Sequence, residues 1–182
     1  FKILYPSNDA TLYESDATVN TGLDEILEIG KRQSTNVTSS FALARSLVKF
    51  DMTEVSESLS KYNKTVNDCK FILQLYTTHA KNLPSSYTVD VNVVGQDWTN
   101  GTGFINYETP VKDGCCWDSP NLETTAWISS SQDANVPAGS TLFVSGSGKG
   151  GSWLFEKGSA TPNGGGTLYS QSFDDTSLNQ MS

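Results

Sequence analysis

The stretch Tyr87-Thr88-Val89-Asp90-Val91-Asn92-Val93-Val94 decides the fold class. Its residues alternate, so that one face carries tyrosine and valine side chains and the other carries threonine, aspartate and asparagine. A period of two is typical of a β-strand with one buried face, whereas a helix would scatter the polar side chains around its axis. The sequence therefore predicts a strand here.

A second stretch, Cys69–Tyr76, shows the same pattern, with Phe71, Leu73 and Leu75 on one face. The residues between the two stretches form a polar loop that contains Pro84. Strands joined by a short loop pair antiparallel. We therefore expect the two stretches to form a hairpin.

Further short apolar or alternating runs are separated by residues that favour turns. The strands expected from them are Lys2–Tyr5, Ala10–Tyr13, Glu25–Gly30, Arg45–Phe50, Thr124–Ile128, Thr141–Ser145, Trp153–Glu156 and Leu168–Phe173. One short helix of a turn or two is expected within Asp51–Leu59. Many short strands with frequent turns predict an all-β fold, an antiparallel β-sandwich or jelly roll with long loops and little helix.

The length of 182 residues suits one β-sandwich domain over residues 1–182. The chain starts at Phe1 and stops at Ser182 in linker-like sequence, so we expect it to be part of a longer polypeptide. The net charge of −8 disfavours phosphate backbones, so no nucleic-acid partner is expected. No run approaches the roughly 20 apolar residues that span a bilayer, so no membrane insertion is expected.

Catalytic motifs are sparse. The single histidine, His79, has no Gly-x-Ser-x-Gly elbow to accompany it, and a surface position is the simpler interpretation. The glycine-rich run Gly146–Gly151 is flexible by composition and lacks the spacing of a phosphate-binding loop. We therefore predict that the chain is not an enzyme. A hydrolase or lyase is the remaining alternative, because a pair of carboxylates has no sequence signature.

Cofactor motifs are equally sparse. The sequence lacks the spacing of a zinc site and of an EF-hand, so no cofactor is firmly predicted. A looser Ca²⁺ site at Asp9, Asp16, Asn20 and Asp24 is an alternative to simple solvation of these side chains. The three cysteines, Cys69, Cys115 and Cys116, favour free thiols over a disulfide from Cys69 to one of the other two.

The tryptophans all lie in the second half of the chain, at Trp98, Trp117, Trp127 and Trp153. An indole either fills the end of a sandwich core or, when exposed, stacks on a sugar ring. Trp117, in a polar loop, is the first candidate for a ligand contact. The predicted ligand-binding set is Trp117, Trp98, Asp97 and Asp118.

An ordered series of short motifs resembles a known domain family. The motifs are Asn8–Tyr13, Asn20-Thr21-Gly22, Ile26–Gly30 and Arg45–Asp51, followed by the strand-like Phe71–Tyr76 and a valine-rich strand ending near Trp98. Their order resembles the DNRLRE-type domain, which overlaps the family-96 carbohydrate-binding modules. The resemblance implies a β-sandwich.

More narrowly, the chain resembles structural proteins of T4-like marine and cyanobacterial tailed phages. The strings that carry this likeness are Leu4–Thr11, Asn20–Ile29 and Trp98–Gly103. The resemblance implies a virion location and a structural or adhesion role in a neck, tail or fibre. The partners expected are other virion proteins, copies of this chain and host polysaccharide. The alternative is an extracellular, secreted carbohydrate-binding module attached to a larger protein.

Overall fold

The computed structural model describes residues 1–33, 41–76, 78, 86–106, 109–121, 125–129, 132–133, 142–156 and 167–174. His79 lies outside the described residues. The contacts divide the chain into two compact units, which we describe separately. Unit 1 comprises residues 1–50 and 92–167, and unit 2 comprises residues 51–91 and 168–182. The expectation of one domain over residues 1–182, within a longer polypeptide, stays a prediction.

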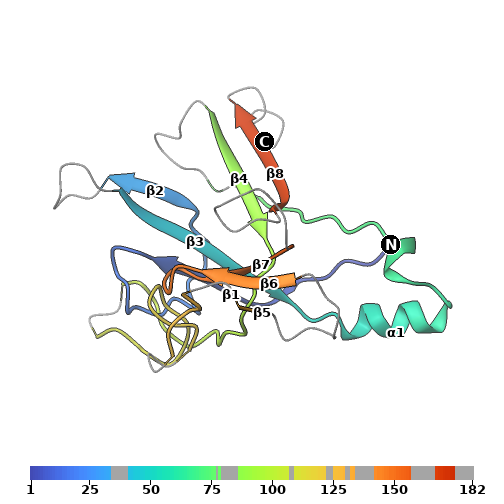
Figure 1. Cartoon of the computed structure of the whole chain (residues 1–182), viewed down its shortest axis with the longest axis horizontal. Helices are drawn as coiled ribbons and strands as arrows, with labels where there is room; N and C mark the ends of the chain where they lie inside the picture. Colours follow the sequence, from blue (N-terminus) through green and yellow to red (C-terminus); the bar gives the residue numbers. More distant parts are fainter. Residues whose placement is uncertain are drawn as a thin grey trace. The chain divides into compact units, whose positions relative to one another are not determined.

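The first sheet of unit 1 is antiparallel and has β3 (Phe41–Phe50) at its centre. β1 (Pro6–Tyr13) pairs along most of one edge of β3, and β2 (Gly30–Gln33) pairs with residues 41–44 on the other edge (Figure 1). Because β2 is short, residues 45–50 of β3 pair only with β1 among the residues that the structure describes.

The second sheet of unit 1 contains β5 (Gln132–Asp133), β6 (Leu142–Gly146) and β7 (Ser152–Glu156), in that order and antiparallel. Side chains from the two sheets meet, since the Arg45 guanidinium in β3 lies 5.5 Å from the ring centre of Trp153 in β7. The core cluster comes from β1, β3 and the loops, and consists of Ala10, Leu12, Leu47, Trp98, Cys115, Trp117 and Trp127. The all-β, antiparallel prediction is confirmed.

Unit 2 contains the helix α1 (Thr53–Lys61), the 3₁₀ turn η1 (Val66–Asp68), and a pair of strands, β4 (Ser86–Asn92) and β8 (Thr167–Asp174). The predicted short helix forms, and it extends to Lys61, two residues beyond the expected end. At its start, the Asp51 carboxylate accepts a hydrogen bond from the Thr53 amide at 2.9 Å, one of the first amides that have no partner within a helix. In the described part of the chain, no helix has the length and apolar character needed to cross a bilayer.

The predicted hairpin between Cys69–Tyr76 and Tyr87–Val94 is wrong. The second stretch forms β4, which pairs with β8, whereas residues 69–76 have no regular structure and their side chains are exposed. Alternation shows that a segment could bury one face, but a strand also needs a partner for its backbone groups.

Glu25–Gly30 is also not a strand, apart from Gly30, which begins β2. Side chains satisfy its backbone instead. The Thr11 hydroxyl accepts a hydrogen bond from the Glu28 amide at 3.0 Å, and the Ser46 hydroxyl donates to the Glu28 carbonyl at 3.0 Å. Such side-chain bonds compete with a sheet ladder.

Two further strand predictions are wrong in the described residues. Lys2–Tyr5 has no regular structure, and within Thr124–Ile128 the structure describes only a single bridge from Thr125 to Asn121. The last three predicted strands are confirmed as β6, β7 and β8.

Candidate functional site

A buried polar network surrounds Asn20 in unit 1. Its side-chain amide donates to the carbonyl oxygens of Asn100 at 2.7 Å and Cys115 at 2.8 Å. Its side-chain oxygen accepts from the amides of Gly22 at 3.2 Å and Gly103 at 2.7 Å. Asn20 is fully buried, so each of these bonds replaces water that the groups would otherwise contact.

The same network extends to β1. The Thr21 hydroxyl both accepts from the Thr11 amide at 2.9 Å and donates to the Thr11 carbonyl at 2.7 Å. The Asn100 side chain accepts from the Asp9 amide at 3.0 Å and donates to the Gly22 carbonyl at 2.6 Å. Segments about 80 residues apart in sequence are therefore joined by side chains that the sequence motifs contain.

The predicted calcium ligands do not form one cluster with Asn20, because its oxygen already accepts two amide hydrogens. An Asp24 oxygen accepts the Ile105 amide at 3.1 Å, and Asp16 is exposed and accepts the Ser15 hydroxyl at 2.8 Å. Within the described ranges, no group of three or more aspartate, glutamate, histidine or cysteine side chains is placed to hold a metal ion.

Trp117 lies in the core. Stacking on a sugar requires an exposed ring, so the structure does not support its predicted role as a ligand contact. The side chain is 6% exposed, and a Cβ added to Gly150 would lie 2.8 Å from its ring. The Arg45 guanidinium lies 5.2 Å from the ring centre and donates to the Gly150 carbonyl at 2.7 Å. A sugar could reach this indole only by displacing the Gly150 backbone.

The glycine-rich run takes a defined path over Trp117. The Gly150 amide donates to the Trp117 carbonyl at 2.6 Å, and Gly150 has a φ of +68°, which suits glycine. At the neighbouring position, the Lys149 ammonium lies 2.8 Å from an Asp118 oxygen. This contact raises the pKa of Lys149 through its hydrogen bond and charge. Asp118 is therefore paired with the loop and not free for a ligand.

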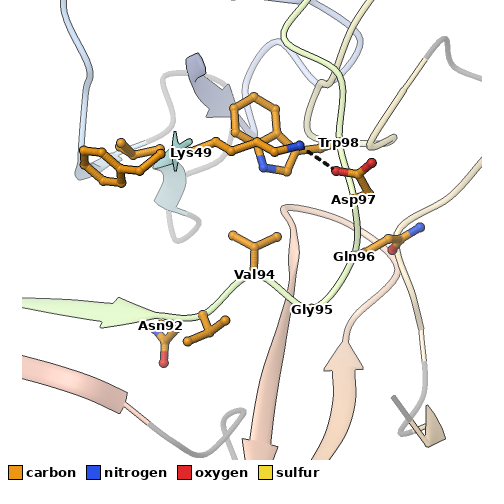
Figure 2. A pocket seen from close by; sticks show the side chains of 10 residues that line it. Lys49, Asn92, Val94, Gly95, Gln96, Asp97 and Trp98 are labelled. Atoms are coloured by element: carbon orange, nitrogen blue, oxygen red, sulfur yellow. Dashed lines mark hydrogen bonds and ion pairs between the residues drawn. The ribbon is translucent and has the colours of Figure 1, made fainter. Parts of the chain in front are cut away.

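The other two predicted ligand residues, Asp97 and Trp98, line an open groove of about 450 Å³ in unit 1 (Figure 2). One wall is Val48–Phe50, at the end of β3, and the other is residues 92–98. The structure thus places Asp97 and Trp98 in one groove, whereas Trp117 and Asp118 do not line it.

Across the groove, the Lys49 ammonium lies 2.9 Å from an Asp97 oxygen (Figure 2). The hydrogen bond from Lys49, then one from the Trp98 amide, then the lysine charge hold the pKa of Asp97 below its ordinary value. Both side chains are accessible, at 47% and 89% exposure. Trp98 is 7% exposed, so it supports the groove from the core side.

The second wall is fixed to the β5-β6-β7 sheet. The Val93 carbonyl accepts the Leu154 amide, and the Gly95 amide donates to the Ser152 carbonyl, each at 2.9 Å. Gly95 is needed for this approach, because a Cβ there would lie 2.7 Å from a Val144 methyl group. The side chain of Gln96 points away from Lys49 and accepts the Ile128 amide at 3.1 Å (Figure 2).

The sequence interpretation missed Lys49 and the other residues of its wall. This wall, Val48–Phe50, lies within the expected strand Arg45–Phe50, and the sequence predicted a strand there but no site. A lysine near the end of a strand has no signal that distinguishes a site from an ordinary solvated charge. Its contact with Asp97 joins residues 48 positions apart in the chain, so no local pattern predicts it.

The cysteines are free thiols in the structure, as the sequence favoured. Cys115 and Cys116 are buried, at 0% and 1% exposure, whereas Cys69 is exposed. We predict that iodoacetamide at pH 8 modifies Cys69 rapidly and the other two only in denaturant, as read by mass spectrometry. Equal modification of all three in the folded protein would contradict the burial.

Alkaline pH is predicted to destabilise the fold. Burial, followed by the neighbouring Cys116, raises the pKa of the Cys115 thiol from 9.0 to about 12. A raised folded pKa contributes stability below pH 9, and that stability is lost as the pH rises toward 12. At pH 10.5 the thiol ionises in the unfolded chain but not in the folded one. We expect this to lower the free energy of unfolding, measured in urea, by about 2 kcal/mol relative to pH 7.5.

The Cys115→Ala variant is the control for this pH dependence. Burial also raises the pKa of Tyr13 to about 12. The variant should therefore still lose some stability at alkaline pH, but less than the original chain. An identical pH profile in the variant and the original chain would show that the Cys115 thiol does not contribute.

Comparison of the chain with protein-family models, with curated proteins and with solved structures found no match in any of the three. The family resemblance therefore rests on the ordered motifs whose contacts are given above.

Proposed function

We propose that this chain is a non-enzymatic structural or adhesion module of a tailed-phage virion, located in a neck, tail or fibre. Its partners would be other virion proteins or copies of itself, with host surface glycans as a further contact. The location and the partners derive from the motif resemblance to the DNRLRE-type domain and to phage structural proteins.

One observation carries the structural part of the proposal. The polar residues of the motifs, above all Asn20, Thr21 and Asn100, use their hydrogen bonds inside the fold. Groups committed in this way hold the fold together and are not free to contact a ligand. This supports a structural role for the motif residues.

Immunogold labelling of source particles with an antibody to the chain tests the virion location. We expect gold at a fixed position on the particle, lost when the antibody is first absorbed with purified chain. Particles that carry no label, with the same antibody recognising the denatured chain on a blot, would overturn the virion role.

The second candidate is a secreted carbohydrate-binding module. The accessible Lys49 and Asp97 in an open groove favour it. A glycan array tests it, and binding without any virion label would favour this candidate over the first.

A Ca²⁺ contact at Asp9, Asp16, Asn20 and Asp24 stays part of the proposal as the sequence predicted it, although in the described residues these carboxylates do not form a group of three. The array is therefore run with calcium and with a chelator. An unchanged binding pattern and an unchanged melting temperature would overturn a calcium role.

A further inference from the structure

The groove of unit 1 combines two kinds of surface. Val48, Phe50, Val93 and Val94 supply apolar area, while Lys49, Asn92 and Asp97 supply polar groups. Polar and apolar atoms share the lining about equally. Small-ligand sites are concave, place a few convergent polar groups beside apolar surface, and occupy roughly 300–1,000 Å³. The groove, at about 450 Å³, falls in this range.

The ion pair in the groove is available to a ligand. An exposed lysine–aspartate pair contributes little to stability, so exchanging its direct contact for contacts to a ligand costs little. The ammonium offers three donors, and the carboxylate only accepts. Two neighbouring hydroxyl groups match them, because one hydroxyl accepts from Lys49 while its neighbour donates to Asp97.

The charges around the groove select against anionic ligands. The charges of Lys49 and Asp97 cancel, and the chain as a whole carries −8. That net charge repels a polyanion at long range. A neutral molecule with adjacent hydroxyls and an apolar C–H face fits both the charges and the apolar lining.

We propose that this groove binds a neutral saccharide, with adjacent hydroxyl groups on Lys49 and Asp97 and a C–H face against Val94 and Phe50. The inference rests on the proposed glycan contact and adds the site and the ligand class. Gln96 takes no part, because its side-chain oxygen is bonded to the Ile128 amide.

Calorimetric titration of the full chain with cellohexaose, mannohexaose and polygalacturonate tests this. We expect binding of a neutral hexasaccharide, weakened about tenfold by Lys49→Met, which removes the donor, and by Asp97→Asn, which removes the charge of the acceptor. The matched controls are Lys64→Met and Asp68→Asn, from an exposed pair 4.0 Å apart in unit 2. The controls should bind like the original chain.

Three other results of the titration would each contradict a different part of this proposal. Binding of polygalacturonate alone, lost in Lys49→Met, would overturn the neutral class. Neutral-sugar binding that neither groove variant weakens would overturn the groove while leaving the proposed glycan contact. The absence of binding by all three probes would overturn this inference, and the immunogold result separately decides the virion role.

Discussion

Replacing Asn20 by alanine is expected to lower the free energy of unfolding by about 4 kcal/mol. The substitution leaves two carbonyl oxygens and two amides in the interior without their partner, at Asn100, Cys115, Gly22 and Gly103. A buried group without a hydrogen bond costs about 1–3 kcal/mol. Four such groups would cost at least about 4 kcal/mol, and partial relaxation keeps the loss near this lower bound. Urea unfolding followed by tryptophan fluorescence measures the loss.

Asn106→Ala is the control, because that side chain is exposed, and its effect should stay within about 0.5 kcal/mol. If the Asn20→Ala chain does not fold, recovery of soluble protein replaces the unfolding curve as the measure. Loss of less than about 1 kcal/mol would contradict a central role for this side chain.

Asn20→Asp separates the network from the calcium alternative. An aspartate keeps an acceptor for the Gly22 and Gly103 amides but turns an oxygen toward the carbonyl oxygens of Asn100 and Cys115. We expect a destabilisation as large as that of Asn20→Ala, unchanged by calcium. Rescue of the Asn20→Asp variant by millimolar calcium would favour the metal site.

The second large effect is expected from Gly22→Ala, at about 3 kcal/mol. A Cβ at this position would overlap the backbone oxygen of Asn100 and lie 2.6 Å from the backbone oxygen of Gly101. Backbone atoms cannot turn aside as a flexible side chain can, so the two loops would have to separate. Their separation would also weaken the bonds that Asn20 makes between them.

Gly30→Ala is the matched control, since no atom lies within 4 Å of a Cβ added there. It should be neutral or slightly stabilising, because alanine restricts the unfolded chain more than glycine does. Thermal melts of the two variants side by side give the comparison. Equal melting temperatures would show that the loops at Gly22 and Asn100 are not closely packed.

Alternation predicted the fold class because a period of two reports how a strand presents its faces. It succeeded for β1, β3, β4 and the last three strands, each of which begins or ends within a few residues of the expected bounds. It failed for Cys69–Tyr76 because the pattern is local and does not identify a partner. β8, far along the chain, takes the place of that stretch beside β4.

The candidate site was half predicted. Asp97 and Trp98 follow a strand in sequence and do line the groove, whereas Trp117, the first candidate, is in the core. A tryptophan in polar sequence has the same local pattern in either environment. Its burial here depends on Arg45 and Gly150, which approach it from distant parts of the chain.

Hydrogen exchange of single backbone amides tests most directly the central claim that distant motif segments are held by one buried network. The amides of Thr11, Gly22 and Gly103 each donate to a side chain of that network. We predict that they exchange slowly and with a common free energy of opening, while the amides of Ile72 and Leu73 exchange rapidly. Exchange of the three network amides as fast as that of Ile72 would contradict the account.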